Sequence, residues 1–415
     1  MEGRNKTHSL VTGNITWGML WFAVPMILGN LLQQFYNIAD TLIVGRFLGA
    51  KALAAVGSAY TLMIFLTSVL LGLCMGSGVV FSLQYGARDH EALKRSIFVS
   101  LVLIGVITLL LNIAVFVWID PILRLLQVPA EVYILMRDYL WIIFGGIGFT
   151  FLYNYYASLL RAVGNSVLPL VFLAVAVVLN IVLDLVFILY FGWGVRGAAL
   201  ATVKEIATYS SLTCAQQSVM NFGILMVQGL INSFGTAVMA GFAAAVKIDS
   251  FAYMPVQDFG NAFSTFIAQN FGAGKHERIR KGIRVAVRVT LIFCLIISVL
   301  VFVLARPLML IFIPAHETEI ISIGVEYLRI EGAFYCGIGW LFLLYGFYRA
   351  VRRPGMSVVL TVISLGVRVA LAYTLAAIPG IGVWGIWWSI PIGWFLADIF
   401  GWCYYRMKQR KSLEW

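Results

Sequence analysis

Long apolar runs constrain this chain more than any other feature. A helix of about 20 mostly apolar residues crosses the roughly 30 Å of hydrocarbon in a bilayer. Only 11% of the residues are charged, against about 25% in soluble domains, so no large water-facing domain is expected. The sequence therefore predicts an all-α polytopic membrane protein with eleven spans, at residues 17–43, 53–83, 96–118, 133–160, 166–190, 206–232, 236–268, 285–313, 321–348, 355–378 and 383–405.

Lysine and arginine are divided unevenly between alternate loops. The two termini and the loops expected on their side of the membrane contain 18 of these residues, whereas the opposite loops contain 6. The positive-inside rule then places both termini in the cytoplasm. We expect a multi-pass protein of the inner (cytoplasmic) membrane, in contact with the lipid bilayer. The net charge of +11 indicates this orientation rather than a nucleic-acid partner.

Four short motifs occur twice, in the same order and at offsets of 186 to 188 residues. Both copies of the first motif fall on the cytoplasmic side, so the two halves share one direction through the membrane. Such a parallel repeat, with a pseudo-two-fold axis along the membrane normal, predicts two pseudo-symmetric lobes of six helices each. The paired motifs are Gln84–His90 with Asn270–His276, Pro121 with Pro307, Arg161–Val163 with Arg349–Val351, and Gly194–Gly197 with Gly382–Gly385.

The repeat leaves too few residues for twelve complete helices. Its offset maps the last span back to about 195–217 and the first span forward to about 203–229, so residues 203–217 would have to serve two helices. We therefore predict a truncated sixth helix and a missing linker near Val203 and Lys204. The N-terminal lobe would then comprise residues 1–203 and the C-terminal lobe residues 204–415. Whether the missing segment is a natural deletion is left open.

Polar groups inside the spans are the candidates for function, because a carboxylate at membrane depth usually faces protein or a water cavity. Two acids with amide and hydroxyl neighbours could bind Na⁺, or burial could make one of them a proton carrier. Alternatively, the acids are hydrated at helix ends and the amides only join helices. The predicted ion-coupling residues are Asp40, Asp184, Asn180, Asn154 and Thr202, with a possible Na⁺ at Asp40 and Asp184.

A substrate cavity is expected where polar and aromatic side chains share the spans, since aromatic faces bind flat organic cations. The repeat aligns Arg368 with Asn180, so the halves differ chemically and coupling is expected mainly in the N-terminal half. Pro25 removes a backbone hydrogen bond within the first span and is the predicted hinge. The candidate cavity residues are Gln33, Gln34, Asn37, Tyr36, Tyr139, Gln228, Asn232, Tyr253, Glu331 and Arg368.

Enzyme signatures do not account for the remaining motifs. Gly272-Ala-Gly-Lys275 lacks the first glycine of a phosphate-binding loop, and His276 stands where that loop has serine or threonine. We expect a tight turn there, and a protein that is not an enzyme and needs no cofactor beyond a coupling ion, H⁺ or Na⁺.

Several stretches together resemble prokaryotic transporters of the multidrug and toxic compound extrusion (MATE) family. The resemblance implies two six-helix lobes around a central cleft and export of small organic cations in exchange for H⁺ or Na⁺. It also implies that Asp40 and Asp184, with Asn180, Asn154 and Thr202, are the acid site of the N-terminal lobe. We expect a monomer; a lipid-linked precursor flippase and a transport-inactive homologue are the alternatives. The stretches are Pro25, Gln33–Asp40, Gly45–Gly49, Gln84–Ala87, Leu160–Asn165, Gly194–Ala199, Gln228–Gly235 and Gln269–Gly274.

Overall fold

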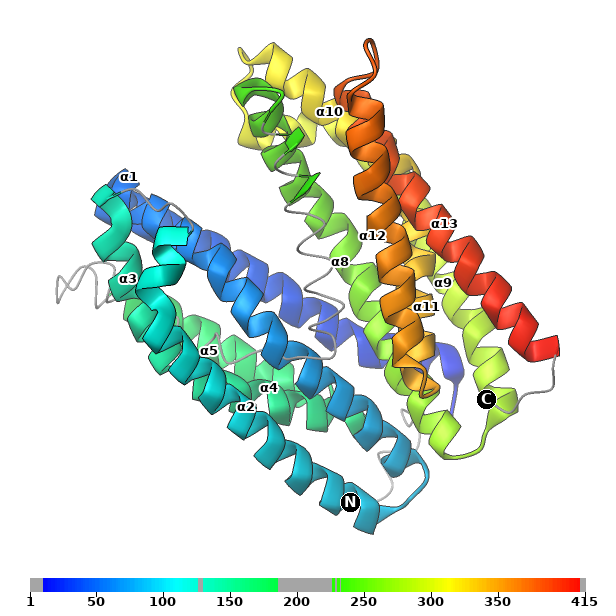
Figure 1. The fold of residues 1–415 in the computed structure, drawn as a ribbon. Coiled ribbons are helices and arrows are strands. Elements are labelled where there is room, and N and C mark those ends of the chain that lie inside the picture. Colours follow the sequence, from blue (N-terminus) through cyan, green and yellow to red (C-terminus); the bar gives the residue numbers. More distant parts are fainter. Residues whose placement is uncertain (1–9, 126–129, 186–225, 228–229, 232, 411–415) are drawn as a thin grey trace. The chain divides into compact units, whose positions relative to one another are not determined.

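The computed structural model describes residues 10–125, 130–185, 226–227, 230–231 and 233–410. Within these residues the chain forms α-helices and no β-strand, which confirms the predicted fold class (Figure 1). The helices belong to two compact units. The C-terminal unit is the described part of Met1–Ala23 and Val219–Trp415, and the N-terminal unit is that of Val24–Ser218. The predicted lobe boundary at residues 203 and 204 lies outside the described residues.

The N-terminal unit is built from α1 (Ile15–Gly86) from Val24 onward, α2 (His90–Leu125), α3 (Ala130–Gly145), α4 (Ile147–Ala162) and α5 (Val167–Leu185). Figure 1 draws α1 as two limbs, dark blue for the first half and lighter blue for the second. Helix continues through residues 44–52, where the sequence predicted a loop between two spans. This stretch has no proline, and its alanine, leucine, arginine and lysine favour helix.

The C-terminal unit contains α8 (Thr236–Gly272), α9 (His276–Phe312), α10 (Thr318–Ala333), α11 (Tyr335–Ala350), α12 (Pro354–Ala376) and α13 (Val383–Arg410). In the described part of the chain, six helices are long and apolar enough to cross a membrane, or up to eight if each bent pair is one span. The predicted span at 206–232 lies mostly outside that part.

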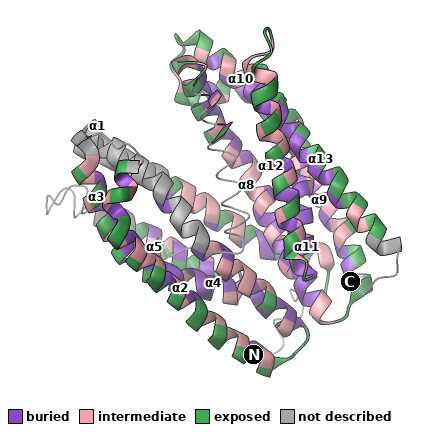
Figure 2. Ribbon diagram, viewed as in Figure 1, coloured by how far each residue is buried: buried purple, intermediate pink, exposed green. Residues whose placement is uncertain are grey.

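Exposed side chains on the long helices are largely apolar. Figure 2 shows exposed positions recurring along α2, and the exposed apolar side chains of α2 and α9 include Phe98, Leu109, Val299 and Val303. Water would oppose so much exposed apolar surface, whereas hydrocarbon accepts it. The exposed surface therefore supports a membrane protein.

Two predicted spans are bent rather than straight. Tyr133–Gly145 and Ile147–Ala162 meet at 48°, and Thr318–Ala333 and Tyr335–Ala350 meet at 54°. In the first pair, Asn112 Nδ2 donates a hydrogen bond of 2.7 Å to the carbonyl oxygen of Phe144, next to the bend. A backbone carbonyl released by a kink in a membrane needs such a partner, because lipid offers none.

The predicted repeat is visible in the turns that end the helices. After α1, the amide of Asp89 donates to Gln84 O at 3.1 Å, and after α8 the amide of Lys275 donates to Asn270 O at 2.9 Å. The turn after α4, from Asn165 to Leu160, has its counterpart after α11, from Arg353 to Tyr348, and both hydrogen bonds are 2.9 Å long. These are Schellman turns, at the offsets of 186 and 188 predicted from the motifs.

Each pair of turns places one residue in the left-handed region, and glycine fills the position only once per pair. Arg88 (φ 58°) corresponds to Gly274 (φ 68°), and Arg352 (φ 59°) corresponds to Gly164 (φ 90°). A side chain in this region costs roughly 1–2 kcal/mol. The left-handed backbone conformation of these turns is therefore the same in both halves, although one half has arginine where the other has glycine.

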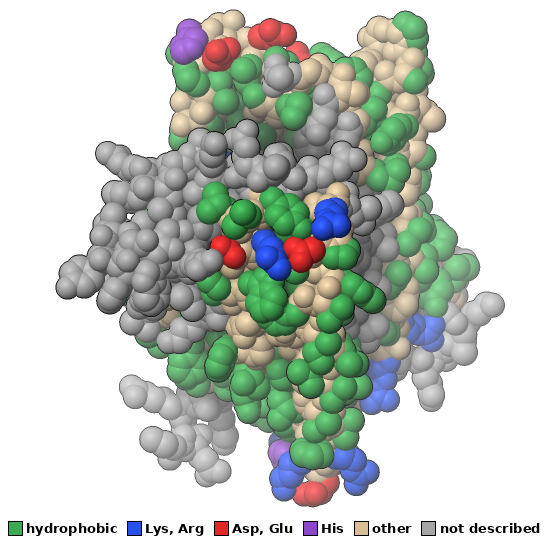
Figure 3. Space-filling view, turned by 60° about the vertical axis from the view of Figure 1, so that its left-hand side comes forward, with side chains coloured by type: hydrophobic (Ala, Val, Ile, Leu, Met, Phe, Trp, Pro, Cys, Tyr) green, Lys and Arg blue, Asp and Glu red, His purple; other side chains and the backbone are tan. Residues whose placement is uncertain are grey.

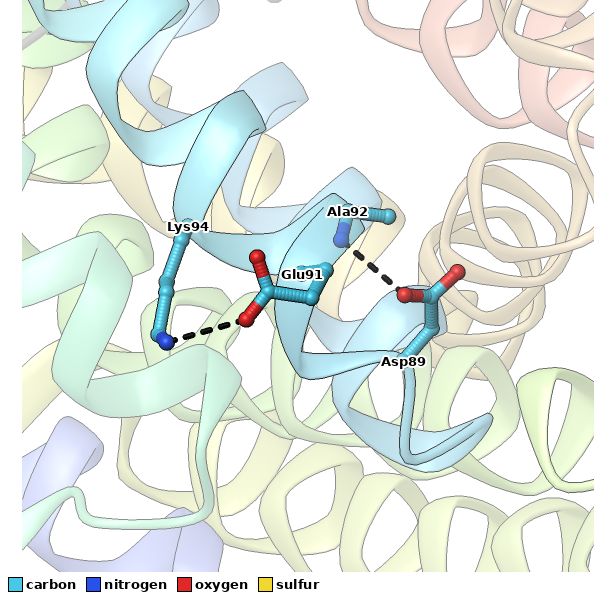
Figure 4. A network of polar contacts seen from close by, with 4 residues as sticks. All are labelled: Asp89, Glu91, Ala92 and Lys94. Atoms are coloured by element: carbon cyan, nitrogen blue, oxygen red, sulfur yellow. Dashed lines mark hydrogen bonds and ion pairs between the residues drawn. The ribbon is translucent and has the colours of Figure 1, made fainter.

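The two copies of the first motif start their next helices differently. Asp89 caps α2, because its Oδ1 accepts the amide hydrogen of Ala92 at 3.0 Å (Figure 4). Beside it, Lys94 Nζ lies 3.1 Å from Glu91 Oε1, but both side chains are exposed and such pairs contribute little. In the second copy Lys275 replaces Asp89, and its ammonium donates instead to Val11 O at 3.0 Å.

That contact is part of an N-terminal strap, which we define as residues 10–13. Arg278 donates to the carbonyl oxygens of Leu10, Thr12 and Gly13 over 2.9–3.3 Å. Asn270 Nδ2 donates to Leu10 O at 3.0 Å, and the Leu10 side chain is buried. The turn between α8 and α9 thus holds the strap through its backbone, which makes the contact independent of most strap side chains.

Removing the Arg278 side chain should release the strap. Hydrogen bonds from a charged donor are worth about 1.5–3 kcal/mol each, so Arg278→Ala should raise the maleimide labelling rate of a Leu10→Cys probe by about tenfold or more. The probe is introduced after the native cysteines are replaced. Arg280→Ala is the matched control, because Arg280 is exposed on the same turn of α9. Equal labelling rates in the two variants would show that the strap does not depend on Arg278.

Candidate functional site

A small polar pocket in the N-terminal unit gathers three of the predicted residues. Pro25, Gln33 and Asn154 line it together with Arg161, and its volume is ≈ 40 Å³. Asn154 is buried, and its Nδ2 donates to Thr150 O at 3.1 Å. A water needs at least about 10–15 Å³, so the pocket has room for water or a small ion but not for an organic substrate.

Four of the five predicted ion-coupling residues, and three of the predicted cavity residues, have side chains outside the described part of the chain. The side chains of Asp40, Asn37, Asn180 and Asp184 lie outside the described residues, although their backbones are helical in α1 and α5. Thr202, Gln228 and Asn232 lie outside them entirely. The ion site of the N-terminal lobe, including a possible Na⁺, therefore stays a prediction.

Two of the predicted cavity aromatics lie in apolar packing. Tyr36 is 2% exposed and belongs to a small cluster with Leu173 and Val177. Tyr139 is equally buried, in the main apolar cluster of the N-terminal unit. Gln34 is partly exposed. In the C-terminal unit Tyr253 is partly exposed, with its ring 6.5 Å from that of Phe342. Contact of these residues with a substrate remains a prediction.

The buried charged side chains that the structure describes are all carboxyl groups. Asp249, Asp258, Glu331 and Asp398 are each at most 9% exposed, and no described lysine or arginine is as deeply buried. All four lie in the C-terminal unit, whereas coupling was expected mainly in the N-terminal half, whose acids Asp40 and Asp184 have side chains outside the described residues. Because an isolated carboxylate is costly to bury, such a set favours neutralisation by a proton or by a bound cation.

Asp249 and Glu331 form the centre of this group. Asp249 on α8 accepts a hydrogen bond of 2.7 Å from the hydroxyl of Tyr335, the first residue of α11. Glu331 lies in the last turn of α10, directly before the 54° bend. Among the described residues its Oε2 is buried without a hydrogen-bond partner. The two carboxyl groups act electrostatically on one another and on Arg368 of α12.

Arg368 only partly balances the two acids. Its Nε is buried without a hydrogen-bond partner among the described residues, and no ion pair within 4.0 Å joins it to a described carboxylate. Lys247, two residues from Asp249, is exposed. Figure 3 shows charged side chains of both signs gathered in a mainly hydrophobic part of one face. Asp249 and Glu331 are thus two buried carboxyl groups whose nearest described cation, Arg368, acts on both of them without forming a close ion pair.

Exposed carboxyl groups differ from the buried ones, because they form ion pairs in contact with water. At the start of α9, a hydrogen bond from the Lys281 ammonium, 2.8 Å from Glu277 Oε1, lowers the pKa of the Glu277 carboxyl below its usual value. Both side chains are exposed, so water screens the pair. This contrast marks the buried carboxyls, rather than the exposed ion pairs, as the candidates for chemistry.

Sequence reasoning missed Asp398. It is 9% exposed on α13, and its Oδ1 has no hydrogen-bond partner within the described part of the chain. The signal was present, because Asp398 interrupts the apolar run of the last predicted span as Asp40 does that of the first. Among the described residues, no three His, Cys, Asp or Glu side chains come close enough to hold a metal ion together.

Comparison with known proteins agrees with the fold and the repeat. The MatE family model matches the chain twice, over residues 25–186 and 212–374. The probable multidrug resistance protein YpnP of Bacillus subtilis is 30% identical over 444 residues, 99% of each chain, and YoeA of the same organism is 27% identical over 95% of this chain and 94% of its own. The alignment with YpnP is longer than this chain, so that relative has residues which this chain lacks.

Solved structures show the same architecture. An outward-facing multidrug resistance MATE transporter of the MOP superfamily superposes with a TM-score of 0.91 at 21% identity, over 100% of both chains. The two family matches begin 187 residues apart, within the offsets that the motifs predicted. Together with the helical fold and the repeated turns, these matches show that the chain belongs to the MatE family.

Proposed function

We propose that this protein is a secondary active antiporter that exports organic cations and drugs in exchange for H⁺ or Na⁺ by alternating access. One observation carries the proposal: every deeply buried charged side chain among those described is a carboxyl group. A transporter that exchanges one cation for another needs anionic groups in its interior that can bind either of them. The multidrug resistance names of YpnP and YoeA support drugs as the substrate class.

The continuity of α1 supports alternating access. The boundary between the two units falls between Ala23 and Val24, inside α1 and one residue before Pro25. A proline in a helix interior removes one backbone hydrogen bond and weakens the helix there. Motion of one unit against the other would therefore bend α1 at Pro25, while the strap keeps residues 10–13 on the C-terminal unit.

We further place the protein in the inner membrane as a monomer, with both termini in the cytoplasm and no resident cofactor. Of the two alternatives, a flippase for lipid-linked precursors would need cationic groups for its pyrophosphate, and the buried carboxyls argue against it. A transport-inactive homologue is the alternative that a missing segment near Val203 and Lys204 would favour.

Efflux measurements test this proposal. Energised cells or proteoliposomes are loaded with a fluorescent organic cation, and export is followed under a proton or a sodium gradient. We expect Asp40→Asn, Asp249→Asn and Glu331→Gln each to lower the export rate by at least about tenfold, the effect expected when a positioned charge is lost. Glu319→Gln is the matched control, because Glu319 is exposed in the first turn of α10.

The outcomes separate the alternatives. Export that follows one gradient and fails in the carboxyl variants, at equal expression, identifies the coupling ion. Export that is unchanged in all three variants contradicts ion coupling through these acids. No export by the unaltered protein, with intact folding, favours the inactive homologue.

A further inference from the structure

An apolar groove opens on the C-terminal unit between α9, α11 and α13. Its volume is ≈ 610 Å³, within the roughly 300–1,000 Å³ of small-molecule pockets. Ile292 and Leu295 of α9 form one wall and are more than half exposed, and Leu343 and Leu344 of α11 form another. The groove is therefore shaped for a long apolar group rather than for water.

Two arginines interrupt this apolar lining. Arg284 and Arg288 both line the groove, and their spacing of four residues puts them on one face of α9. Both are exposed, and neither forms an ion pair within the described part of the chain. Like charges at this spacing repel one another, so an anion between them would relieve an unfavourable contact.

The surroundings of the two arginines are those expected where a membrane meets water. Arg288 is followed by an uncharged run, Val289–Ala305, of 17 residues, which spans about 25 Å as a helix. Trp402 and Tyr405 of α13 line the same groove, and the Arg406 guanidinium lies 4.4 Å from the Trp402 ring centre. Tryptophan, tyrosine and arginine gather at the headgroup level of bilayers, so the charged end of the groove faces headgroups.

We propose that this groove is a binding site for an anionic phospholipid of the surrounding bilayer. The phosphate lies between Arg284 and Arg288, whose guanidinium groups match phosphate geometry. An acyl chain follows Leu291, Ile292 and Leu295 along α9. A cationic substrate is disfavoured here by the same two charges, which separates this site from the buried carboxyls.

Lipid titrations followed by native mass spectrometry of the detergent-purified protein test the site. Phosphatidylglycerol is compared with phosphatidylcholine on the unaltered chain and on Arg284→Gln/Arg288→Gln. Each cation near a headgroup contributes about 1 kcal/mol, so the double variant should bind phosphatidylglycerol roughly 30-fold more weakly. The matched control is Arg306→Gln/Arg329→Gln, which removes two exposed arginines outside the groove.

A second pair of variants tests the acyl-chain part of the site. Ile292→Trp fills the groove and should abolish the high-affinity lipid without changing any charge. Val299→Trp is the control, because Val299 is exposed on the same helix but does not line the groove. Equal binding of the two lipids, equal losses in the two arginine pairs, or a groove filled by a second copy of the chain would each overturn the proposal. None of these readouts depends on transport.

Discussion

Replacing Arg368 with methionine is expected to destabilise the protein by about 2 kcal/mol, below the roughly 3–5 kcal/mol for breaking a buried ion pair, because the half-buried Arg368 forms no close pair with a described carboxylate. The guanidinium acts on both Asp249 and Glu331. Without it the two buried carboxyl groups repel one another more strongly. Among the described residues, the Tyr335 hydroxyl, 2.7 Å from Asp249, and the Tyr327 hydroxyl beside Glu331 remain to offset their charge. Unfolding of the detergent-purified protein, followed by tryptophan fluorescence, measures the loss.

A second substitution distinguishes electrostatics from lost packing. Glu331→Gln in the Arg368→Met background removes one of the repelling charges and should recover most of the lost stability, whereas packing lost with the arginine would not return. Arg329→Met is the control, because Arg329 is an exposed arginine of α10 that lies over the Phe302 ring at 5.4 Å. If Arg368→Met costs no more than Arg329→Met, Arg368 does not stabilise the acids.

The internal repeat is the part of the fold that the sequence predicted best. Its motifs lie in turns, where a few residues fix the backbone through Schellman hydrogen bonds. The matching turns at Gln84–Asp89 and Asn270–Lys275 confirm it. The motif comparison did not predict that Arg88 and Arg352 would adopt the left-handed conformation that glycine adopts at the matching positions. Arginine alone does not signal such a turn in a sequence, although its turns have the same hydrogen bonds as the glycine turns.

The bends could not be predicted from hydropathy. The predicted span 133–160 stays apolar through its break point at Gly146, and the span 321–348 contains Glu331 three residues before its break point at Phe334 without losing its apolar average. The information lies in tertiary contacts such as the one from Asn112 to the Phe144 carbonyl. An asparagine in one span does not reveal which carbonyl of another span it will reach.

For the candidate site, the sequence predicted the type of residue involved better than it predicted where each side chain lies. Intramembrane acids were singled out because burial makes them costly, and Glu331 is indeed buried. Tyr139 was expected at a cavity and lies in an apolar cluster. In a membrane both the packed face and the lipid face of a helix are apolar, so the periodicity that orients side chains in soluble helices is weak.

Placing alanine at Gly346 is expected to destabilise the C-terminal unit by about 3 kcal/mol, the upper end of the usual range for overpacking. An added Cβ would lie 2.5 Å from the carbonyl oxygen of Gly260, and a Cβ at Gly260 would lie 3.0 Å from that of Phe342. These obstacles are backbone atoms, so α8 and α11 must separate to admit even a methyl group. Close approach through small residues is how helices pack tightly in membranes.

Gly366→Ala is the matched control and should have the opposite sign. Gly366 lies inside α12 with nothing within 4 Å of an added Cβ, so alanine gains about 1 kcal/mol of helix propensity there. Thermal unfolding followed by size-exclusion chromatography measures both variants under one condition. Equal stability of the two would mean that α8 and α11 are not in backbone contact at Gly260 and Gly346. If only Gly346→Ala lowers the stability, the contact between Gly346 and the Gly260 carbonyl is a point where the C-terminal unit tolerates no added methyl group.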